Sequence, residues 1–566
     1  MEIQKEILKI CMKKGFLLDK EMLGSLSVLD EESAKKLIET LENLKIDERV
    51  ITKSLFCKNF EKIRNVLIDG RNKTIIEKFF ISLGYARTEI NPGEGVLDEG
   101  ALEKVETTGK IKLISSPAIP PKKVEVQDFV KYFRIRYDNM KKIFQDKNLE
   151  NLSSIRKLGD RKDNYTIIVA IMEKRITKNK NIILTVEDMS GTARVIINKN
   201  KEDVFEKAKD LLVDDIVAMQ VSGNSEWLFG NEIIFPDSYL SEKKKSNIDE
   251  WVVFTSDVHV GSKMFLEKNF LKFIKWINGN EGTEEQREIA KKVKYLFLAG
   301  DSIDGVGVFP DQEKVLAIKD IKDQYEKLCE YLRLIRKDIK IILSPGQHDG
   351  VRVAEPQPIV EEYYAPGLHK MENLSLVSNP AMVEIDGDFR VLIYHGAGFH
   401  GMVDEIEDIR LNYGHNSPAR MVKEVLKRRH LSPMHGPTTY IPSDKEDPLM
   451  IVNVPDILLT GDWHRAEVGM YNNILTVAGS CWQSITPFEE KVGNHPDPCK
   501  VPLVNLKTRE IKILDFSEEE SFVAEGKESI GGEVLGGLRE KTCEEDKGGV
   551  VCSVAPVVVG VLEDKK

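Results

Sequence analysis

The spacing of hydrophobic residues divides the chain into segments of different texture. Over residues 1–83 apolar side chains recur at helical intervals, as in Ile3, Ile7 and Ile10, which predicts a small helical N-terminal domain. Over 84–124 the periodicity gives way to prolines, glycines and short polar runs. Such composition is typical of turns and loops, so this stretch is predicted to be a flexible linker.

The next segment, 125–245, is rich in β-forming residues. After a short aromatic and basic helix it contains five runs of strand-like sequence, and a helix-like insert, Glu202 to Leu212, follows the third run. Five strands with a helix after the third predict an OB-fold β-barrel. Its aromatic residues Tyr165, Trp227 and Phe229 are candidates for stacking on single-stranded nucleic acid, although a packing and docking role is the favoured interpretation.

Buried apolar strands alternate with amphipathic helices over 246–516. One helix, predicted between Asp311 and Asp338, places its apolar residues on a single face. This alternation predicts an α/β core, a sheet-based sandwich with covering helices. The last segment, 517–566, has 12 acidic and 6 basic residues and several glycine pairs, which predicts an acidic, mostly disordered tail.

Polar clusters follow five apolar strands of the predicted α/β core. Taken singly, each cluster is more often structural: a helix cap, a turn or a buried core histidine. Ligands of open α/β sheets gather at the carboxyl ends of the strands, so all five clusters are expected to converge. Divalent cations relieve the repulsion between neighbouring carboxylates, and two of them polarise a phosphate for attack by hydroxide. In chain order the clusters are Asp257-Val258-His259, Gly300-Asp301-Ser302-Ile303-Asp304, Gly346-Gln347-His348-Asp349, His395-Gly396 and Gly461-Asp462-Trp463-His464.

This order resembles the calcineurin-like metallophosphoesterase superfamily, whose signature is D-x-H, G-D-x-x-D, G-N-H-D/E, H and G-H-x-H. A closer resemblance, running from the helix before the barrel to about Phe516, is to the small, exonuclease subunit of archaeal DNA polymerase D. Residues 128–133, 346–358 and 427–433 carry it. The chain therefore resembles a multidomain protein with a metallophosphoesterase core behind an OB fold.

The resemblance implies a role for each cluster. His348 would protonate the leaving oxygen with Asp349 orienting it, and Arg352 is a candidate contact to DNA. The protein would bind two divalent ions. The family usually binds manganese, and magnesium is the alternative. One metal is implied at Asp257, His259, Asp301 and His464, and the second at Asp301, Gln347, His395 and Asp462. Two of these residues depart from the family pattern: Gln347 replaces an asparagine and Asp462 replaces the first histidine of G-H-x-H.

The implied function is a metal-dependent 3′–5′ exonuclease that proofreads for a large polymerase subunit on DNA. The alternative is a catalytically weakened scaffold that stabilises that subunit. The two departures keep this alternative open, whereas the retained residues of the signature argue against it, namely Asp257, His259, Asp301, His348, His395 and His464. A free-standing phosphodiesterase is a third interpretation, which the long region before the core disfavours. Gln127, Val130 and Phe133 faintly resemble a sliding-clamp peptide, although helix packing explains them better.

Charge and cysteine content exclude several classes of protein and of site. The net charge is −11, of which −6 lies in the tail, so the chain does not coat nucleic acid by bulk electrostatics. Seven scattered cysteines without a CxxC argue against a disulfide framework or a zinc-thiolate site. Without a long apolar run or a secretory signal, a cytoplasmic protein with no membrane contact is expected.

Overall fold

A computed structural model describes residues 110–517, apart from 118, 120–122, 160–161, 387 and 493, together with five short strands outside this range. The chain forms two compact units, Met1–Val105 and Glu106–Lys566. In the first unit, β1 (Leu17–Leu18) and β2 (Val50–Ile51) pair in parallel. The rest of the predicted helical domain and residues 84–109 of the predicted linker lie outside the described residues.

The barrel of the second unit is closed by five strands in the order β4-β5-β6-β8-β7. Alternate side chains of these strands point inward, as in Ile167, Val169 and Ile171 of β4, and form one apolar core. Helix α9 follows the third strand, so strand number and helix position are those that the sequence predicted; the assignment as an OB fold remains a proposal. The elements are β4 (Asp163–Ile176), β5 (Ile182–Asp188), β6 (Gly191–Ile197), α9 (Glu202–Lys209), β7 (Ile216–Gly223) and β8 (Leu228–Ile234).

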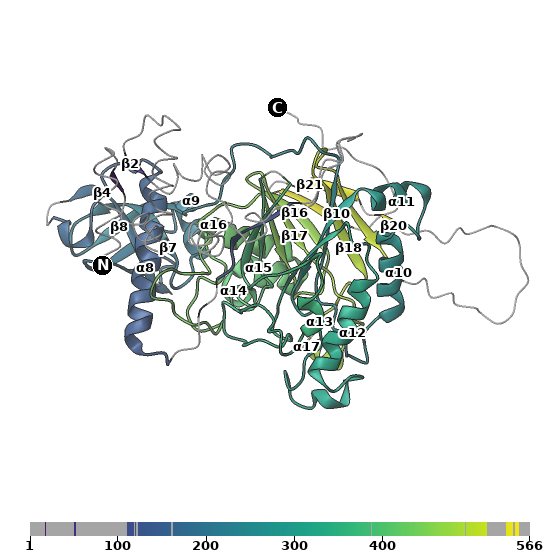
Figure 1. Cartoon of the computed structure of the whole chain (residues 1–566). Coiled ribbons are helices and arrows are strands. Elements are labelled where there is room, and N and C mark those ends of the chain that lie inside the picture. Colours follow the sequence, from purple (N-terminus) through teal and green to yellow (C-terminus); the bar gives the residue numbers. More distant parts are fainter. Residues whose placement is uncertain are drawn as a thin grey trace, which may run out of the picture. The chain divides into compact units, whose positions relative to one another are not determined.

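The α/β core contains two sheets (Figure 1). The first has the order β12-β11-β10-β9-β18-β19-β20 and the second β16-β17-β15-β14-β13-β3. The first comprises β9 (Trp251–Thr255), β10 (Val293–Ala299), β11 (Lys340–Ser344), β12 (Leu374–Leu376), β18 (Lys500–Asn505), β19 (Ile511–Asp515) and β20 (Arg539–Glu540). The second comprises β3 (Ile111–Ser115), β13 (Ala381–Ile385), β14 (Phe389–Ile393), β15 (Ile457–Thr460), β16 (Glu467–Tyr471) and β17 (Ile474–Ala478).

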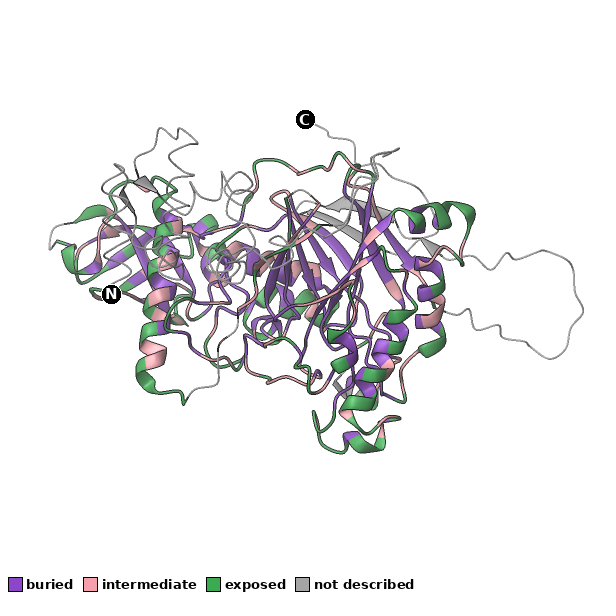
Figure 2. Cartoon of the chain, in the orientation of Figure 1, coloured by how far each residue is buried: buried purple, intermediate pink, exposed green. Residues whose placement is uncertain are grey.

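The two sheets pack face to face. Phe254 and Phe297 of the first sheet share one buried cluster with Val391 and Leu459 of the second. Helices α10, α11 and α12 cover the first sheet, and α14, α15 and α16 pack with the second. Figure 2 shows the strands almost fully buried and these helices exposed on one side. The helices are α10 (Glu267–Ile277), α11 (Glu284–Lys291), α12 (Ile321–Arg333), α13 (Pro366–His369), α14 (Phe399–Glu405), α15 (Glu407–Asn412), α16 (Pro418–Arg428) and α17 (Pro487–Val492).

Helix α8 (Val126–Gln145) precedes the barrel and packs on both the barrel and the core. Its Phe133 ring lies against His435, so this residue of the faint clamp motif serves helix packing. The barrel also contacts the core directly, because Arg428 Nε of α16 donates to Asp215 Oδ1 at 3.0 Å. These contacts agree with a packing role for the barrel.

Three segments differ from the sequence expectation. Residues 111–115, inside the predicted linker, form β3, which pairs antiparallel with β13 and places Ile111 and Ile114 against buried clusters. Helix α12 begins at Ile321 rather than near Asp311, because the Asp320 side chain caps the amides of Lys322 and Asp323. The predicted disordered tail contains strands β20, β21 (Thr542–Asp546) and β22 (Gly549–Ser553).

None of the helices within the described ranges combines the length and apolar character that crossing a membrane requires.

Candidate metal centre

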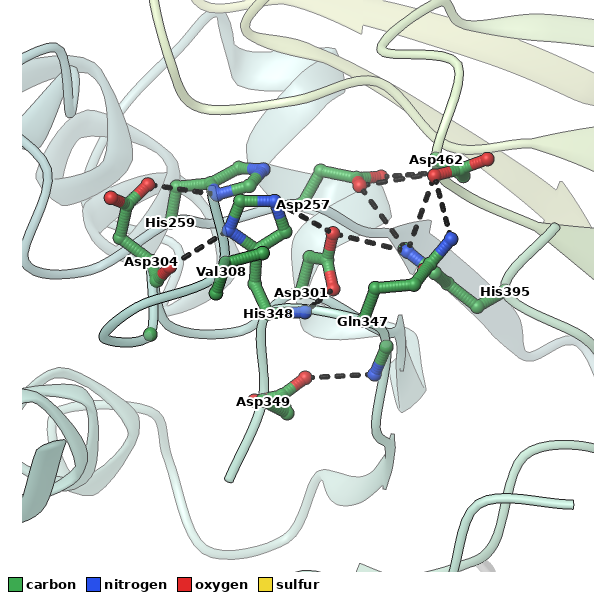
Figure 3. Close-up of polar contacts among 12 residues, drawn as sticks. Asp257, His259, Asp301, Asp304, Val308, Gln347, His348, Asp349, His395 and Asp462 are labelled. Atoms are coloured by element: carbon green, nitrogen blue, oxygen red, sulfur yellow. Dashed lines mark hydrogen bonds and ion pairs between the residues drawn. The ribbon is translucent and has the colours of Figure 1, made fainter. Parts of the chain in front are cut away.

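The five predicted clusters meet at one edge of the sandwich, and both sheets contribute to them (Figure 3). Strands β9, β10 and β11 of the first sheet run in parallel, so the loops that follow them emerge side by side. Strands β14 and β15 of the second sheet are also parallel to each other. The loops after these five strands bring together Asp257, His259, Asp301, Asp304, Gln347, His348, His395, Asp462 and His464.

The backbone is strained at five of these residues. Asp257, His259, Asp301, Asp462 and His464 have φ values of 50°, 54°, 48°, 69° and 55°. This left-handed region is unfavourable for residues with a Cβ, and such strain clusters at functional sites, where the surrounding fold imposes it.

Two imidazoles face each other across the first part of the centre. His259 Nε2 lies 3.2 Å from His464 Nε2. The Nδ1 atom of His259 lies 3.2 Å from Asp304 Oδ1, and Nδ1 of His464 lies 2.7 Å from Glu489 Oε1. A carboxylate accepts a hydrogen bond, so each Nδ1 carries a hydrogen and each Nε2 is the nitrogen turned toward the centre. A cation bound between the two rings would take both Nε2 atoms as ligands.

The second part of the centre contains polar atoms that lack a partner. His395 Nδ1 donates to the carbonyl of Ala299 at 2.7 Å, which turns its Nε2 toward the centre, 3.2 Å from Asp301 Oδ2. Among the described residues, His395 Nε2 and Gln347 Oε1 are buried without a hydrogen-bond partner. Gln347 Nε2 donates to Asp462 Oδ1 at 3.3 Å, so the amide oxygen is free to act as a ligand. Buried unsatisfied acceptors are costly, and a bound cation satisfies them.

Gly346 leaves space that these side chains use. A Cβ at this position would lie 2.2 Å from Asp301 Oδ1 and 2.7 Å from His395 Nε2. Both distances are far below van der Waals contact. Any other residue would therefore displace the carboxylate or the imidazole.

Three groups of side chains in the described part of the chain have ligand atoms close enough to hold a metal ion. They are Asp257 with His259 and His464, Asp257 with Asp301 and His395, and His259 with Asp304 and His348. The resemblance implied Asp301 as the shared carboxylate, whereas Asp257 is the one common to the first two groups. The donor set of carboxylate, imidazole and amide oxygen suits a divalent cation.

His348 lies beside this donor set, half-buried. Its amide donates to Asp301 Oδ1 at 2.8 Å, and its Nδ1 lies 2.7 Å from the carbonyl of Asp304. Asp349 does not orient this ring as expected. Its carboxylate accepts from the amides of Gly346 and Ser302 and from the Tyr325 hydroxyl, so it fixes the loop backbone instead.

The charges of the centre shift its titration. Burial raises the pKa of Asp349 to about 6, helped by the nearby Asp301 carboxylate. Burial alone would also raise the pKa of Asp301, but His395 and His348 outweigh it and hold this pKa well below its usual range. For Asp462, the contact with His400 outweighs burial and lowers the pKa to about 2.

Arg352 differs from the DNA contact that we expected. Its guanidinium donates to the carbonyls of Ile119 at 2.7 Å and Pro356 at 2.6 Å, so its hydrogen-bonding capacity serves the loop itself. On the barrel, Trp227 and Phe229 are exposed.

Sequence reasoning missed Glu489 and His400 as members of the centre. Asp304 was present in the G-D-x-x-D signature, which could have identified it as a partner of His259. Glu489 and His400 lie in no such motif, and only the fold brings them to His464 and Asp462.

A cavity of about 1040 Å³ opens at the centre. His259, Asp301 and His348 line its polar part, while Phe309 and Trp463 contribute an aromatic part. The volume exceeds what metal ions need and is sufficient for an organic substrate.

Comparisons with known proteins agree with this architecture. Residues 252–468 match the family model that describes the B subunits of DNA polymerases alpha and epsilon. The chain is 37% identical over 394 residues to the DNA polymerase II small subunit of Methanothermobacter thermautotrophicus, covering 69% of this chain and 80% of that protein. The small subunit of Pyrococcus furiosus is also 37% identical over 399 residues, which cover 69% of this chain and 64% of that protein.

Among solved structures, an archaeal phosphodiesterase matches 46% of this chain and 98% of its own, at 15% identity and a TM-score of 0.24, which is too low to place the fold. The sequence relatives are decisive, and they confirm the resemblance. The chain belongs to the family of DNA polymerase II small subunits.

Proposed function

We propose that this chain is the small subunit of a two-subunit replicative DNA polymerase and that its metal centre is a 3′–5′ exonuclease, hydrolysing terminal phosphodiesters of DNA. The observation that carries the proposal is the convergence of imidazole, carboxylate and amide atoms on one point. His259 and His464 turn their Nε2 atoms toward each other at 3.2 Å, and Gln347 Oε1 and His395 Nε2 are buried without hydrogen-bond partners among the described residues.

The donor atoms fall into two sets. Asp257, His259, Asp301 and His464 would hold one metal ion, and a second would share Asp301 with Gln347, His395 and Asp462. When bound, a pair of divalent ions, of which manganese is the usual one in the family, would supply the charge that polarises a phosphodiester and activates water for attack on phosphorus.

His348 is the proposed proton donor. Because its Nδ1 hydrogen is held by the carbonyl of Asp304, Nε2 is the nitrogen that exchanges a proton with substrate. As the new bond from water oxygen to phosphorus forms and the bond to the 3′ oxygen breaks, protonated His348 would give its Nε2 proton to that oxygen.

The cavity supports a nucleotide as the substrate. A phosphodiester placed at the polar part would bring the terminal base toward the partly exposed ring of Phe309. Aromatic side chains stack on any base, at about 1–3 kcal/mol per base, so binding there would not depend on sequence. An exonuclease that removes any mispaired terminal nucleotide needs such tolerance.

The proposal includes a large catalytic subunit as partner, because the relatives are named as small subunits of a polymerase. With a net charge of −11, this chain would rely on that partner for much of the grip on DNA. The scaffold alternative, in which the centre is inactive, stays open because of the two departures at Gln347 and Asp462, whereas the other residues of the signature are retained.

A direct assay separates the two. A 5′-labelled primer with a mismatched 3′ end is incubated with Mn²⁺ and the chain, alone and with its large subunit. The exonuclease proposal predicts stepwise shortening from the 3′ end, abolished by EDTA and reduced about 10²–10⁴-fold in His348→Ala. An intact primer in both preparations, with metal bound, would establish the scaffold role.

A further inference from the structure

The Asp462 carboxylate has two oxygens with separate contacts. Its Oδ1 accepts from Gln347 Nε2 at 3.3 Å and lies 3.8 Å from His395 Nε2, facing the second donor set. Its Oδ2 lies 2.6 Å from Nε2 of His400, on the opposite side. One oxygen therefore faces the centre while the other is held by an imidazole that belongs to none of the five sequence clusters.

We infer that His400 is a positioning residue that makes Asp462 a ligand of the second metal ion, and that this Asp462–His400 pair replaces the histidine expected at position 462. The inference rests on the two-metal centre proposed above. It does not depend on which phosphodiester the centre hydrolyses.

The Asp462 carboxylate needs a partner to fix its orientation, because either of its two oxygens can face the metal. An aspartate can turn about its terminal bond, or bind a cation through both oxygens. The backbone of Asp462 is fixed, since its amide donates to both oxygens of Asp257 at 3.2 and 3.0 Å, but this leaves the carboxylate free to rotate. A donor on Oδ2 removes that freedom and directs Oδ1 alone toward the metal.

The fold places His400 for this task. It lies in the first turn of α14, just beyond the loop that carries His395, so one segment supplies both a ligand and its neighbour's partner. The His400 ring packs near His415 and Trp463, with ring centroids 5.3 and 6.2 Å away. Because half of the His400 side chain is exposed, burial alone does not fix the ring, and these ring contacts help to orient it.

The two departures from the family pattern then have related consequences. Gln347 is longer than asparagine and also donates to Asp462 Oδ1. Asp462 thus accepts hydrogen bonds on both oxygens, from Gln347 and from His400. Loss of the His400 bond leaves the carboxylate held from one side only, so its alignment with His395 is lost.

The test measures metal binding directly. Mn²⁺ is titrated into the full chain by calorimetry, and electron paramagnetic resonance distinguishes a coupled manganese pair from a single ion. His400→Ala is expected to weaken the second binding step about 10–100-fold, the usual effect of removing a ligand's partner, and to abolish the coupled-pair signal at limiting Mn²⁺.

Two further variants make the test specific. His495→Ala removes an exposed imidazole that does not line the cavity, and it should leave both binding steps unchanged. Asp462→His introduces the family's residue, which has no second carboxylate oxygen for His400 to hold. In that background His400→Ala should have no further effect on the second step.

Each outcome is decisive. If the unmodified chain binds two Mn²⁺ ions and His400→Ala binds them equally well, the positioning role is wrong while the two-metal centre stands. If His400→Ala is equally harmful in the Asp462→His background, the histidine acts through general structure, which also overturns the inference. If the unmodified chain binds only one ion, the proposed two-metal centre fails and takes this inference with it.

Discussion

Three imidazoles of the centre share one hydrogen-bonding arrangement. In His259, His395 and His464 the Nδ1 atom faces an oxygen acceptor, and Nε2 faces the donor set. The sequence predicted these histidines from their positions after buried strands. It did not predict the acceptors, because a carbonyl such as that of Ala299 has no sequence signature and Glu489 is distant along the chain. The convergence of these histidines was therefore predictable, and their orientation was not.

Glu489 offers a test of that orientation. Glu489→Gln replaces the charged acceptor of His464 by a neutral amide, which weakens the bond that keeps Nε2 free of hydrogen. We expect the affinity of the first Mn²⁺ site to fall about 10–100-fold in a calorimetric titration. The control is Glu490→Gln, its exposed neighbour on α17. Equal affinities in the two variants would contradict this role for Glu489.

The buried carboxyl group of Glu355 is expected to make the free energy of unfolding depend on pH. Burial raises its pKa from 4.5 to about 8, against the opposing effects of the Tyr394 hydrogen bond and His395. The folded state therefore binds this proton more tightly than the unfolded chain. Its stabilising contribution is complete below pH 4.5 and is lost as the pH rises through 8.

Urea unfolding of Glu355→Gln across this range measures the effect. The unmodified chain should lose up to about 1.4 kcal/mol per pH unit from this group, and the glutamine variant, which cannot ionise, should lack that component. Parallel pH profiles for the two proteins would show that Glu355 is not protonated in the folded state.

At the scale of elements, one buried carboxylate connects α8 to the core. Asp447 accepts from the Tyr132 hydroxyl and from Arg136 Nε, both at 2.6 Å, and lies 2.9 Å from His430 Nε2. Arg136 also donates to the carbonyl of Pro433 at 2.7 Å. Two of the segments that carried the family resemblance, 128–133 and 427–433, thus meet at this network. Their shared role is to join the helix before the barrel to the core.

Removing the carboxylate should be strongly destabilising. Asp447→Ala leaves the Arg136 guanidinium buried without its counter-charge, and such losses typically cost about 3–5 kcal/mol in the free energy of unfolding. Chemical denaturation monitored by circular dichroism measures it. Glu288→Ala, which breaks an exposed ion pair with Lys291, serves as the control and should leave the unfolding midpoint unchanged. Similar midpoints for both variants would contradict the joining role of Asp447.

Element boundaries were less predictable than element types. The strands before each cluster were expected because they are short, apolar runs that end in polar residues. The start of α12 at Ile321 was missed because the apolar spacing extends upstream through Val315 and Ile318, and the Asp320 cap overrides it. Strand β3 was missed because a lone edge strand such as 111–115 becomes stable only by pairing with β13, which is distant in sequence.

For the whole molecule, the order of the clusters predicted that they converge, and the structure shows how. The sequence did not reveal that two separate sheets supply them, because strand order in a sheet is set by long-range pairing. Asp257 and Asp301, the two candidates for a carboxylate shared by both metal ions, follow adjacent parallel strands. The net charge of −11 agrees with a metal-dependent cleft whose carboxylates are offset by cations.

Anomalous X-ray scattering from crystals of the chain grown with Mn²⁺ tests directly whether two metal ions bind. We predict two manganese peaks at the edge of the sandwich. One should contact His259 and His464, and the other Gln347, His395 and Asp462. A single peak, or none beside Gln347 and Asp462, would contradict the two-metal centre on which the proposed exonuclease depends.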